Sequence, residues 1–297
     1  MSNLLVAALV LLYSFQSAFC NLYAKNYPGK KEHSSPVFSV FYGIITAVVT
    51  LAFSGFIFAP SKETVILGAV NAAVLVAYNT LLIKASALGP FSIIMIMNLS
   101  GGILIPMLWS VLHDGDKLSV FQYIAIAVML VSFVFLNLGG KSGKEKQSGK
   151  VSAKFLVSCI LLGVSNGVYG TLLSVQKKLM GGEESGEMIV ITFAISSLLA
   201  LMLLLIGAKK EALPAFRQNA KSTLALCAAS VAAAAAVNVL MHCLSLINVA
   251  VLYSLDNGGV LLVSALWSAF VLKEKLDRNK IIGLVLAFAA IVALSIL

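Results

Sequence analysis

Residues 88–118 read LGPFSIIMIMNLSGGILIPMLWSVLHDGDKL, and residues 246–276 read LINVAVLYSLDNGGVLLVSALWSAFVLKEKL. The second stretch repeats the first at a constant offset of 158 residues, from 88 to 246. The clearest match is Leu-Trp-Ser, at 108–110 and again at 266–268, which contains the only two tryptophans of the chain. Each copy lies in or just after an apolar run long enough to be a helix. The pattern therefore indicates a duplicated helical segment.

The repeat also aligns polar residues inside the apolar runs. Gly101 aligns with Gly259, and Asn98 aligns with Asp256. Duplicated membrane segments with a polar residue at a matched depth are typical of secondary transporters, whose binding sites lie near the middle of the bilayer. This alignment is the strongest indication of function in the sequence.

The composition indicates a membrane protein that crosses the bilayer several times. The chain has 297 residues, of which 60% are hydrophobic and only 11% are charged, too few charges to cover a soluble domain. A helix that spans the hydrocarbon needs about 20 apolar residues. Ten runs qualify: 3–24, 37–58, 64–86, 90–112, 119–138, 153–176, 187–208, 222–245, 249–271 and 279–297. We expect an all-α integral membrane protein of ten transmembrane helices, with its first helix retained and not cleaved.

The net charge of +9 does not indicate a nucleic-acid partner. Lys and Arg lie almost entirely between the apolar runs or at their ends, where the positive-inside effect places them, and no basic patch with interleaved aromatics is present. The four cysteines, Cys20, Cys159, Cys227 and Cys243, lie inside apolar runs without metal-ligand spacing. We interpret them as small packing residues that form no disulfide framework.

A polar stretch at 139–152, rich in Gly, Ser and Lys, has the composition of a flexible linker. It divides the chain into a first five-helix repeat at 1–138 and a second at 153–297. Because five is odd, the second copy enters the membrane from the opposite side, which predicts an inverted repeat. One set of loops carries 17 of the 21 Lys and Arg residues, so the positive-inside rule places that set and the linker in the cytoplasm and both termini outside.

The chain resembles the ten-helix, EamA-like branch of the drug/metabolite transporter superfamily. The resemblance rests on the two five-helix repeats and on an acidic residue followed by Lys-Leu after the fourth helix of each, at 116–118 and at 274–276. It is strongest at 271–276, which Ile282-Gly283 follows; the first copy has Asp116 in place of Glu. The resemblance implies alternating access around a central cavity and substrates such as amino acids, purines, sugar nucleotides or cationic drugs. Family members usually have cytoplasmic termini, so both orientations stay open.

Asp256 is the sharpest candidate for function. It lies about seven residues into its helix, roughly 10 Å from the helix start at 1.5 Å per residue. An ionisable group at that depth costs several kcal/mol unless it is paired, hydrated or protonated. We expect a role in proton coupling or in recognition of a substrate cation. The alternative is a neutral aspartate that bonds a neighbouring helix or caps a break at Asn257-Gly258-Gly259.

Other polar residues at related depths complete the candidate site. His242 lies one turn after Asn238 on the same helix face, which makes a His242–Asp256 relay possible, although a neutral histidine bonded to a carbonyl at the helix end is the simpler interpretation. Each of the others is as readily explained as a hydrogen bond between helices. Together they predict a polar cavity lining: Asn79, Asn98, Asn238, Gln16, Asn166 and Tyr169.

The sequence thus predicts a secondary transporter in the cell membrane, plasma or inner, that moves a small metabolite or drug, in the direction of export, with protons as a candidate coupling ion. We expect no enzyme activity and no cofactor or metal, because no catalytic or nucleotide-binding motif is present. The expected partners are a small-molecule substrate and the lipid bilayer, without nucleic acid, and a homodimer stays open. Two alternatives remain: a flippase for lipids or lipid-linked sugars on the same scaffold, and a membrane receptor or assembly factor that transports nothing.

Overall fold

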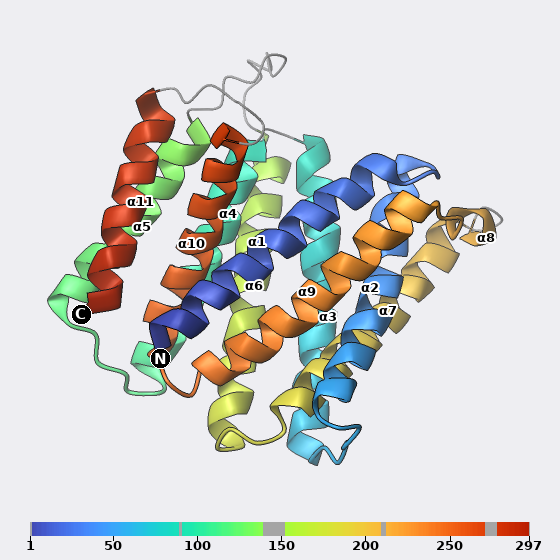
Figure 1. Cartoon of the computed structure of the whole chain (residues 1–297), viewed down its shortest axis with the longest axis horizontal. Helices are drawn as coiled ribbons and strands as arrows, with labels where there is room; N and C mark the ends of the chain where they lie inside the picture. The colour runs from blue at the N-terminus through green and yellow to red at the C-terminus, as the bar shows by residue number, and fades with distance from the viewer. Residues whose placement is uncertain (1, 89–90, 139–151, 209–211, 271–277, 297) are drawn as a thin grey trace. The chain divides into compact units, whose positions relative to one another are not determined.

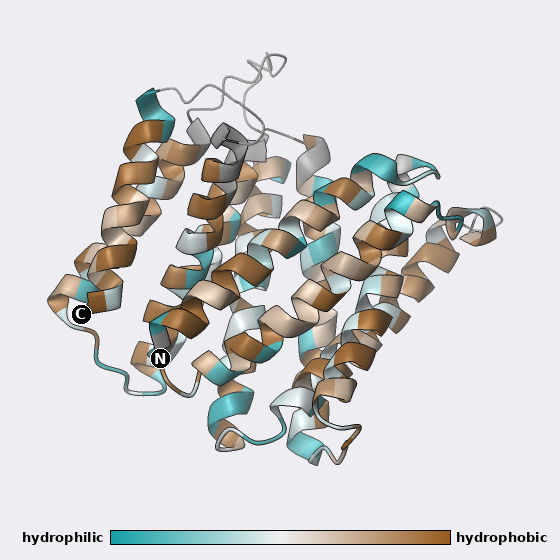
Figure 2. Ribbon diagram, viewed as in Figure 1, coloured by the Kyte–Doolittle hydropathy of each residue, from teal (hydrophilic) through white to brown (hydrophobic). Residues whose placement is uncertain are grey.

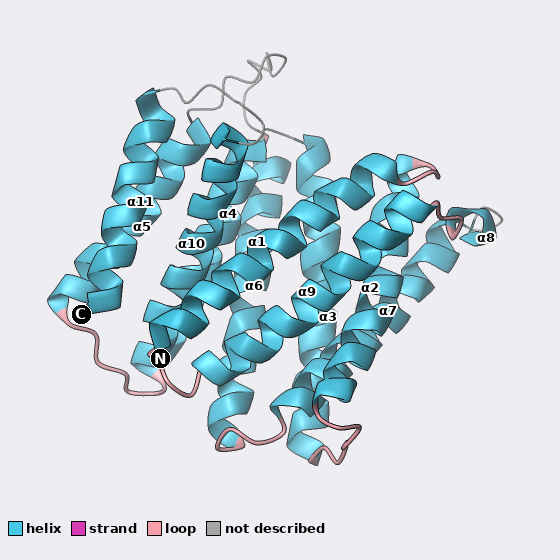
Figure 3. Ribbon diagram, in the orientation of Figure 1, coloured by secondary structure: helices cyan, strands magenta, loops and turns pink. Residues whose placement is uncertain are grey.

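The computed structural model describes residues 2–88, 91–138, 152–208, 212–270 and 278–296. In these ranges the chain consists of helices and short connections (Figure 3). The helices follow one another along the chain (Figure 1): α1 (Ser2–Asn26), α2 (Lys31–Phe53), α3 (Lys62–Leu88), α4 (Phe91–Leu112), α5 (Val120–Leu138), α6 (Ala153–Leu179), α7 (Ser185–Ala208), α8 (Ala212–Ala215), α9 (Ala220–Cys243), α10 (Val249–Phe270) and α11 (Arg278–Ile296).

The helices have the length and composition of membrane spans. Among the described residues, eight are long and apolar enough to cross a bilayer, and α5 and α10 contribute shorter apolar helices. Figure 2 shows hydrophobic residues predominating along the helices. The prediction of an all-helical chain is confirmed for the described residues, and these long apolar helices are compatible with a multi-pass membrane protein. The inverted repeat of ten spanning helices stays a prediction. The predicted linker at 139–152 lies almost entirely outside the described residues, as does the second acidic motif at 274–276.

Serine side chains cap the first turns of two helices. The hydroxyl oxygen of Ser61 accepts a hydrogen bond from the backbone N–H of Thr64 at 3.2 Å, at the start of α3. Ser119 and Gln122 exchange bonds at the start of α5: the backbone N–H of Gln122 donates to the serine hydroxyl, and that of Ser119 donates to the glutamine side chain. These contacts satisfy N–H groups that the first helical turn leaves free.

The second helix is displaced from its predicted range of 37–58, because α2 spans Lys31–Phe53. Pro36 therefore lies inside the helix and not in its first turn; so near the start it removes only one backbone bond. The early end comes from a turn in which Gly55 and Phe56 both have positive φ, at 65° and 61°. The N–H of Phe56 then donates to the carbonyl of Leu51 at 2.8 Å, which closes the helix.

The helices form two compact units that do not follow the division at the linker. Unit 1 comprises Met1–Val10, Ala77–Ser174 and Leu246–Leu297. In it α10 packs against α4, α5 and α11, and α5 packs against α4 and α11. A buried cluster of Phe155, Cys159 and Leu162 from α6 meets Ile94 of α4. This unit therefore brings the two repeated segments, in α4 and α10, into direct contact.

Unit 2 comprises Leu11–Val76 and Val175–Ser245. In it α2 packs against α7, α8 and α9, and α7 packs against α8 and α9. Aromatic rings from α1 and α2 stack along one seam, with the ring centroids of Tyr23 and Phe38 4.9 Å apart and those of Phe38 and Tyr42 5.0 Å apart. The core of this unit is thus aromatic and aliphatic.

The four cysteines are free, and Cys227 is exposed, so it does not serve the packing role predicted for it.

Candidate functional site

The side chain of Asp256 is buried in unit 1, in the third turn of α10. The helix begins where the side-chain oxygen of Asn248 accepts a bond from the backbone N–H of Ala250 at 2.9 Å. This start at Val249 carries Asp256 into the apolar part of the helix. The residue is 8% exposed, and its Oδ1 atom is buried without a hydrogen-bond partner. A carboxyl oxygen in such a place is costly unless a ligand or proton reaches it.

Asn98 lies on α4, the helix that packs against α10, at the position that the repeat aligns with Asp256. It is 6% exposed. Its Nδ2 donates to the hydroxyl of Tyr78 at 3.3 Å, whereas its Oδ1 is buried without a partner. The residue therefore resembles Asp256 in its local situation as well as in its place in the repeat. Each keeps a buried oxygen that accepts no hydrogen bond.

Asn166 of α6 contacts both α4 and the region around Gly102. Its Nδ2 donates to the backbone carbonyl of Asn98 at 3.0 Å. A Cβ atom placed on Gly102 would lie 2.6 Å from the same Nδ2 and 3.4 Å from Oδ1 of Asn257 on α10. A side chain at position 102 would press against the amide of Asn166, whereas the amide of Asn257 lies at ordinary contact distance. Helices α4, α6 and α10 therefore meet at a polar cluster that includes Asn257, the residue that follows Asp256.

The cluster extends along α6 and α10 through Tyr253. Its hydroxyl donates to the carbonyl of Gly170 at 2.8 Å, and Nδ2 of Asn257 donates to the carbonyl of Tyr253 at 2.8 Å. Tyr169, the residue before Gly170, is half-buried. Sequence reasoning missed Tyr253, Asn257 and Tyr78 as members of the site. The available signal was spacing, because Tyr253 lies one turn before Asp256.

The candidate residues predicted from sequence divide between the two units. Asp256, Asn98, Asn166 and Tyr169 lie in unit 1 with the half-buried Asn79. The structure joins Asn98 and Asn166 by a direct hydrogen bond. The remaining three lie in unit 2: Gln16, Asn238 and His242.

In unit 2 these side chains take part in packing between helices or lie at the surface. Nδ2 of Asn238 donates to Thr50 Oγ1 on α2 at 3.1 Å and to the carbonyl of Ala234 at 2.7 Å. Nε2 of Gln16 donates to the hydroxyl of Tyr42 at 2.7 Å. His242 is exposed in the last turn of α9. The His242–Asp256 relay therefore joins an exposed side chain to a buried one in the other unit, and it stays a prediction.

A polar junction in unit 2 connects two loops at the ends of the helices. Oε2 of Glu184 accepts bonds from the hydroxyl of Ser61 at 2.7 Å and from its backbone N–H at 2.9 Å. Hydrogen bonds from the Thr64 side chain and from Ser61 hold the pKa of Glu184 below its ordinary value. This carboxylate, unlike Asp256, is fully engaged, and it fixes the entry of α3.

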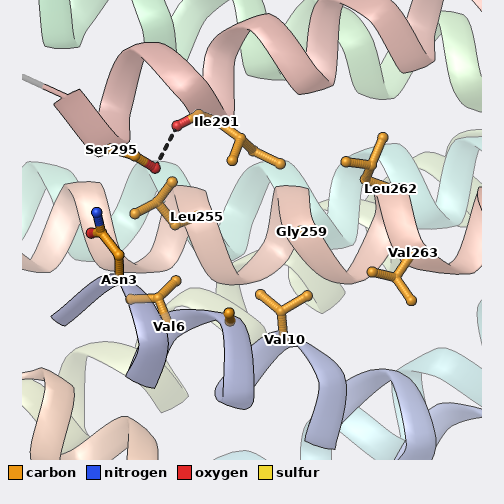
Figure 4. Close-up of a pocket in the computed structure, with 10 residues that line it drawn as sticks. Asn3, Val6, Val10, Leu255, Gly259, Leu262, Val263, Ile291 and Ser295 are labelled. Atoms are coloured by element: carbon orange, nitrogen blue, oxygen red, sulfur yellow. Dashed lines mark hydrogen bonds between the residues drawn. The ribbon is translucent and has the colours of Figure 1, made fainter. Parts of the chain in front are cut away.

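An apolar groove of about 280 Å³ lies elsewhere in unit 1, between α1 and α11 and over α10. Figure 4 shows Val6 and Val10 of α1 and Ile291 of α11 around this groove. Its walls are aliphatic or glycine apart from Asn3 and Ser295. The groove contains no charged side chain, so it suits an apolar occupant and not a charged solute.

Comparisons with known proteins show the fold and nothing more specific. No family model matches the chain, and no curated protein matches its sequence. A crystal structure of another protein is similar with a TM-score of 0.75, over 99% of this chain and 96% of that chain, at 13% sequence identity. At that identity the likeness extends to the helical fold alone.

Proposed function

We propose that the protein is a secondary transporter that binds a small solute at the Asp256–Asn98 cluster and carries it across a cell membrane by alternating access. The observation that carries the proposal is the pair of buried oxygens without partners at Asp256 and Asn98. These residues lie at repeat-related positions on two helices that pack together. Intramembrane carboxyls are costly to keep and typically mark substrate or ion pathways.

The packing of repeat-related helices supports an inverted repeat. Counting only the ten long helices, the second five-helix copy matches α2 with α7, α4 with α10 and α5 with α11. Each of these pairs is in direct contact. Such pairing is what two copies related by a two-fold axis in the membrane plane produce, and substrate sites of that architecture lie between the copies. The resemblance to the EamA-like transporters leads to the same proposal.

Asp256 gives the transporter a means of coupling. A buried carboxyl that has an unpartnered oxygen can bind a proton or a cation, so occupancy of the site can be linked to an ion gradient. Asn98 occupies the aligned position in the other copy, and an amide does not titrate. Coupling therefore rests on one half of the repeat, and export driven by protons is the form we propose.

The test is Asp256→Asn, compared with Ser254→Ala as a matched control. Ser254 is buried on the same helix, and its hydroxyl bonds only the carbonyl of Ala250 within that helix, at 2.7 Å. Purified protein in liposomes that contain a pH-sensitive dye is exposed to a panel of metabolites and amines. We expect solute-driven proton movement with the parent and the control, and background movement with Asp256→Asn despite normal reconstitution. Full activity of Asp256→Asn across a range of pH would refute the coupling role.

The apolar groove favours a second candidate, a flippase for lipids or lipid-linked sugars on the same scaffold. An acyl chain fits walls that carry aliphatic side chains and only Asn3 and Ser295 as polar residues. Movement of a fluorescent phospholipid between leaflets, measured in the same liposomes, separates the two candidates. Lipid movement without any solute-driven flux would favour the flippase.

A further inference from the structure

The apolar groove of unit 1 is polar at one end only. Figure 4 shows Asn3 and Ser295 at one end of the groove and Leu262 and Val263 at the other. Asn3 is the second residue of α1, and Ser295 is the last but one residue of α11, so the polar end coincides with the ends of two apolar helices. The ends of a helix that spans a membrane lie near the lipid head groups. The groove therefore runs from the level of the head groups toward the middle of the bilayer.

The length of the groove suits an acyl chain within one leaflet. Val10 lies seven residues after Asn3 on α1, and Leu262 lies seven residues after Leu255 on α10. At a rise of 1.5 Å per residue, either pair spans about 10 Å along its helix. One leaflet contributes about 15 Å to a hydrocarbon core of about 30 Å. The groove thus covers most of the depth of one leaflet.

The groove has a buried inner wall and an apolar, exposed surround. Val10 and Leu255 on its inner wall are buried, whereas Ala7 is exposed. On the same two outer helices, Leu4 of α1 is 76% exposed and Ile296 of α11 is 78% exposed. Apolar side chains gathered on a surface in this way are typical of a face that contacts a membrane. An occupant of the groove therefore comes from the bilayer, where acyl chains are the abundant apolar groups.

The packing of α1 against α10 explains why this space stays open. In the first copy of the repeat, a Cβ on Gly101 of α4 would lie 2.2 Å from the carbonyl oxygen of Gly163 on α6, so these two backbones touch. At the aligned Gly259 of α10, a Cβ would lie 2.6 Å from a methyl group of Val10 on α1. The valine side chain therefore holds the backbone of α1 away from that of α10. Both Val10 and Gly259 line the groove, which lies beside this contact.

We infer that the groove binds one acyl chain of a bilayer glycerolipid, whose ester carbonyl accepts a hydrogen bond from the side-chain amide of Asn3. The hydroxyl of Ser295 donates to the carbonyl of Ile291 at 2.8 Å, so Asn3 supplies the N–H groups at this end. The groove contains no charged side chain, so the charge of the head group is not what it recognises. This lipid is a resident ligand between α1, α10 and α11, separate from the solute of the proposed function.

The first experiment compares two lipids that differ only at the ester. Purified full-length protein is stripped of lipid by detergent exchange and titrated with dioleoyl phosphatidylcholine or with its diether analogue, which lacks the carbonyl groups. Native mass spectrometry counts the bound lipids. We expect one tightly bound ester lipid per chain, and a diether that binds roughly threefold to tenfold more weakly because one hydrogen bond is lost. Equal binding of the two lipids, or no tightly bound lipid, would overturn the inference.

Variants connect this binding to the groove. Ala7→Phe places a ring in the groove and should abolish the tightly bound lipid; because Ala7 is exposed, the protein should still fold, which size-exclusion chromatography checks. The matched control is Ala18→Phe, at an exposed position of the same helix outside the groove, and it should retain the lipid. Asn3→Leu should bind the ester and the diether equally. Lipid binding by Ala7→Phe at the level of the parent would contradict the assignment.

Movement of lipid between leaflets separates a resident lipid from a transported one. We expect a fluorescent phosphatidylcholine in liposomes to change leaflets no faster with the protein than without it. Lipid movement that requires the protein and is lost in Ala7→Phe would make the groove part of a flippase path and would overturn the residence of the lipid. Failure of the proposed transport function has a different signature, because solute flux that depends on Asp256 would be missing while lipid binding stayed unchanged.

Discussion

Asp256 of unit 1 and Asn238 of unit 2 were both predicted from sequence to line one polar site, yet the structure gives them different surroundings. Asn238 donates to a threonine on the neighbouring helix and to a carbonyl of its own helix. Asp256 is buried with an oxygen that has no partner. A polar side chain whose bonds are made within the protein holds helices together, whereas one with a free buried atom is available to a ligand.

Unit 2 also contains unpartnered atoms, and they sharpen the comparison. Asn71 is fully buried on α3 without a partner for either side-chain atom, and Oε1 of Gln176 is unpartnered as well. These are neutral amides, whose burial costs far less than that of a carboxylate. The distinguishing feature of unit 1 is therefore an ionisable group among the unpartnered atoms. For this reason we place the binding site there.

The largest loss of stability is expected from Gly101→Leu, because this substitution disrupts the packing of α4 against α6. A Cβ at this position would lie 2.2 Å from the carbonyl oxygen of Gly163 on α6, so the backbones of α4 and α6 would have to separate. Overpacking typically costs about 1–3 kcal/mol and more where backbone must move. We expect loss of monodisperse protein in size-exclusion chromatography. Gly207→Leu on α7, where nothing lies within 4 Å, is the matched control and should be tolerated.

An intermediate effect on stability should separate the two asparagines. Asn238→Leu removes the hydrogen bond to Thr50, and we expect a loss of about 1 kcal/mol, as for other bonds between membrane helices. Asn98→Leu loses one bond to Tyr78 but also removes an amide oxygen that is buried without a partner, so its stability should change less. Thermal unfolding of both variants in detergent measures the difference. A larger loss for Asn98→Leu would contradict the division between packing and binding residues.

The smallest effect is expected at the loop junction of unit 2. Because hydrogen bonds lower the pKa of Glu184, the ionised carboxylate stabilises the folded state above the ordinary pKa of glutamate. That stabilisation is lost as the pH falls through the lowered pKa. We expect Glu184→Gln to unfold at a slightly lower temperature than the parent at neutral pH. The difference should vanish at strongly acidic pH, and a difference that stays constant with pH would contradict the assignment.

Much of the fold could be predicted, because membrane-spanning helices require long apolar runs that are easily found in a sequence. All ten apolar runs correspond to helices. The error at α2 has a local cause, because the turn at Gly55 and Phe56 interrupts an apolar run that continues to 58. Hydropathy does not register such a turn, since the residues in it are themselves apolar.

The candidate site was predictable in part. An acidic residue within an apolar run is conspicuous, so Asp256 and its aligned residue Asn98 stand out from the sequence alone. The roles of Tyr78, Tyr253 and Asn257 were not predictable, because tyrosine and asparagine serve equally often as bonds between helices. Their importance depends on which atoms remain free after packing. Spacing places Tyr253 one turn before Asp256, but it does not show which atoms remain free.

By itself, then, the sequence determined that the chain is helical, that its helices have the composition of membrane spans, and that Asp256 lies deep in an apolar helix. Those properties depend on composition and on local periodicity, which each segment carries alone. Only the tertiary structure decided that α4 and α10 pack together, and that Asn238 is bonded while Asn98 and Asp256 each keep a buried oxygen without a partner. Hydrogen bonding between helices is a property of pairs of segments, and it is fixed only when they meet.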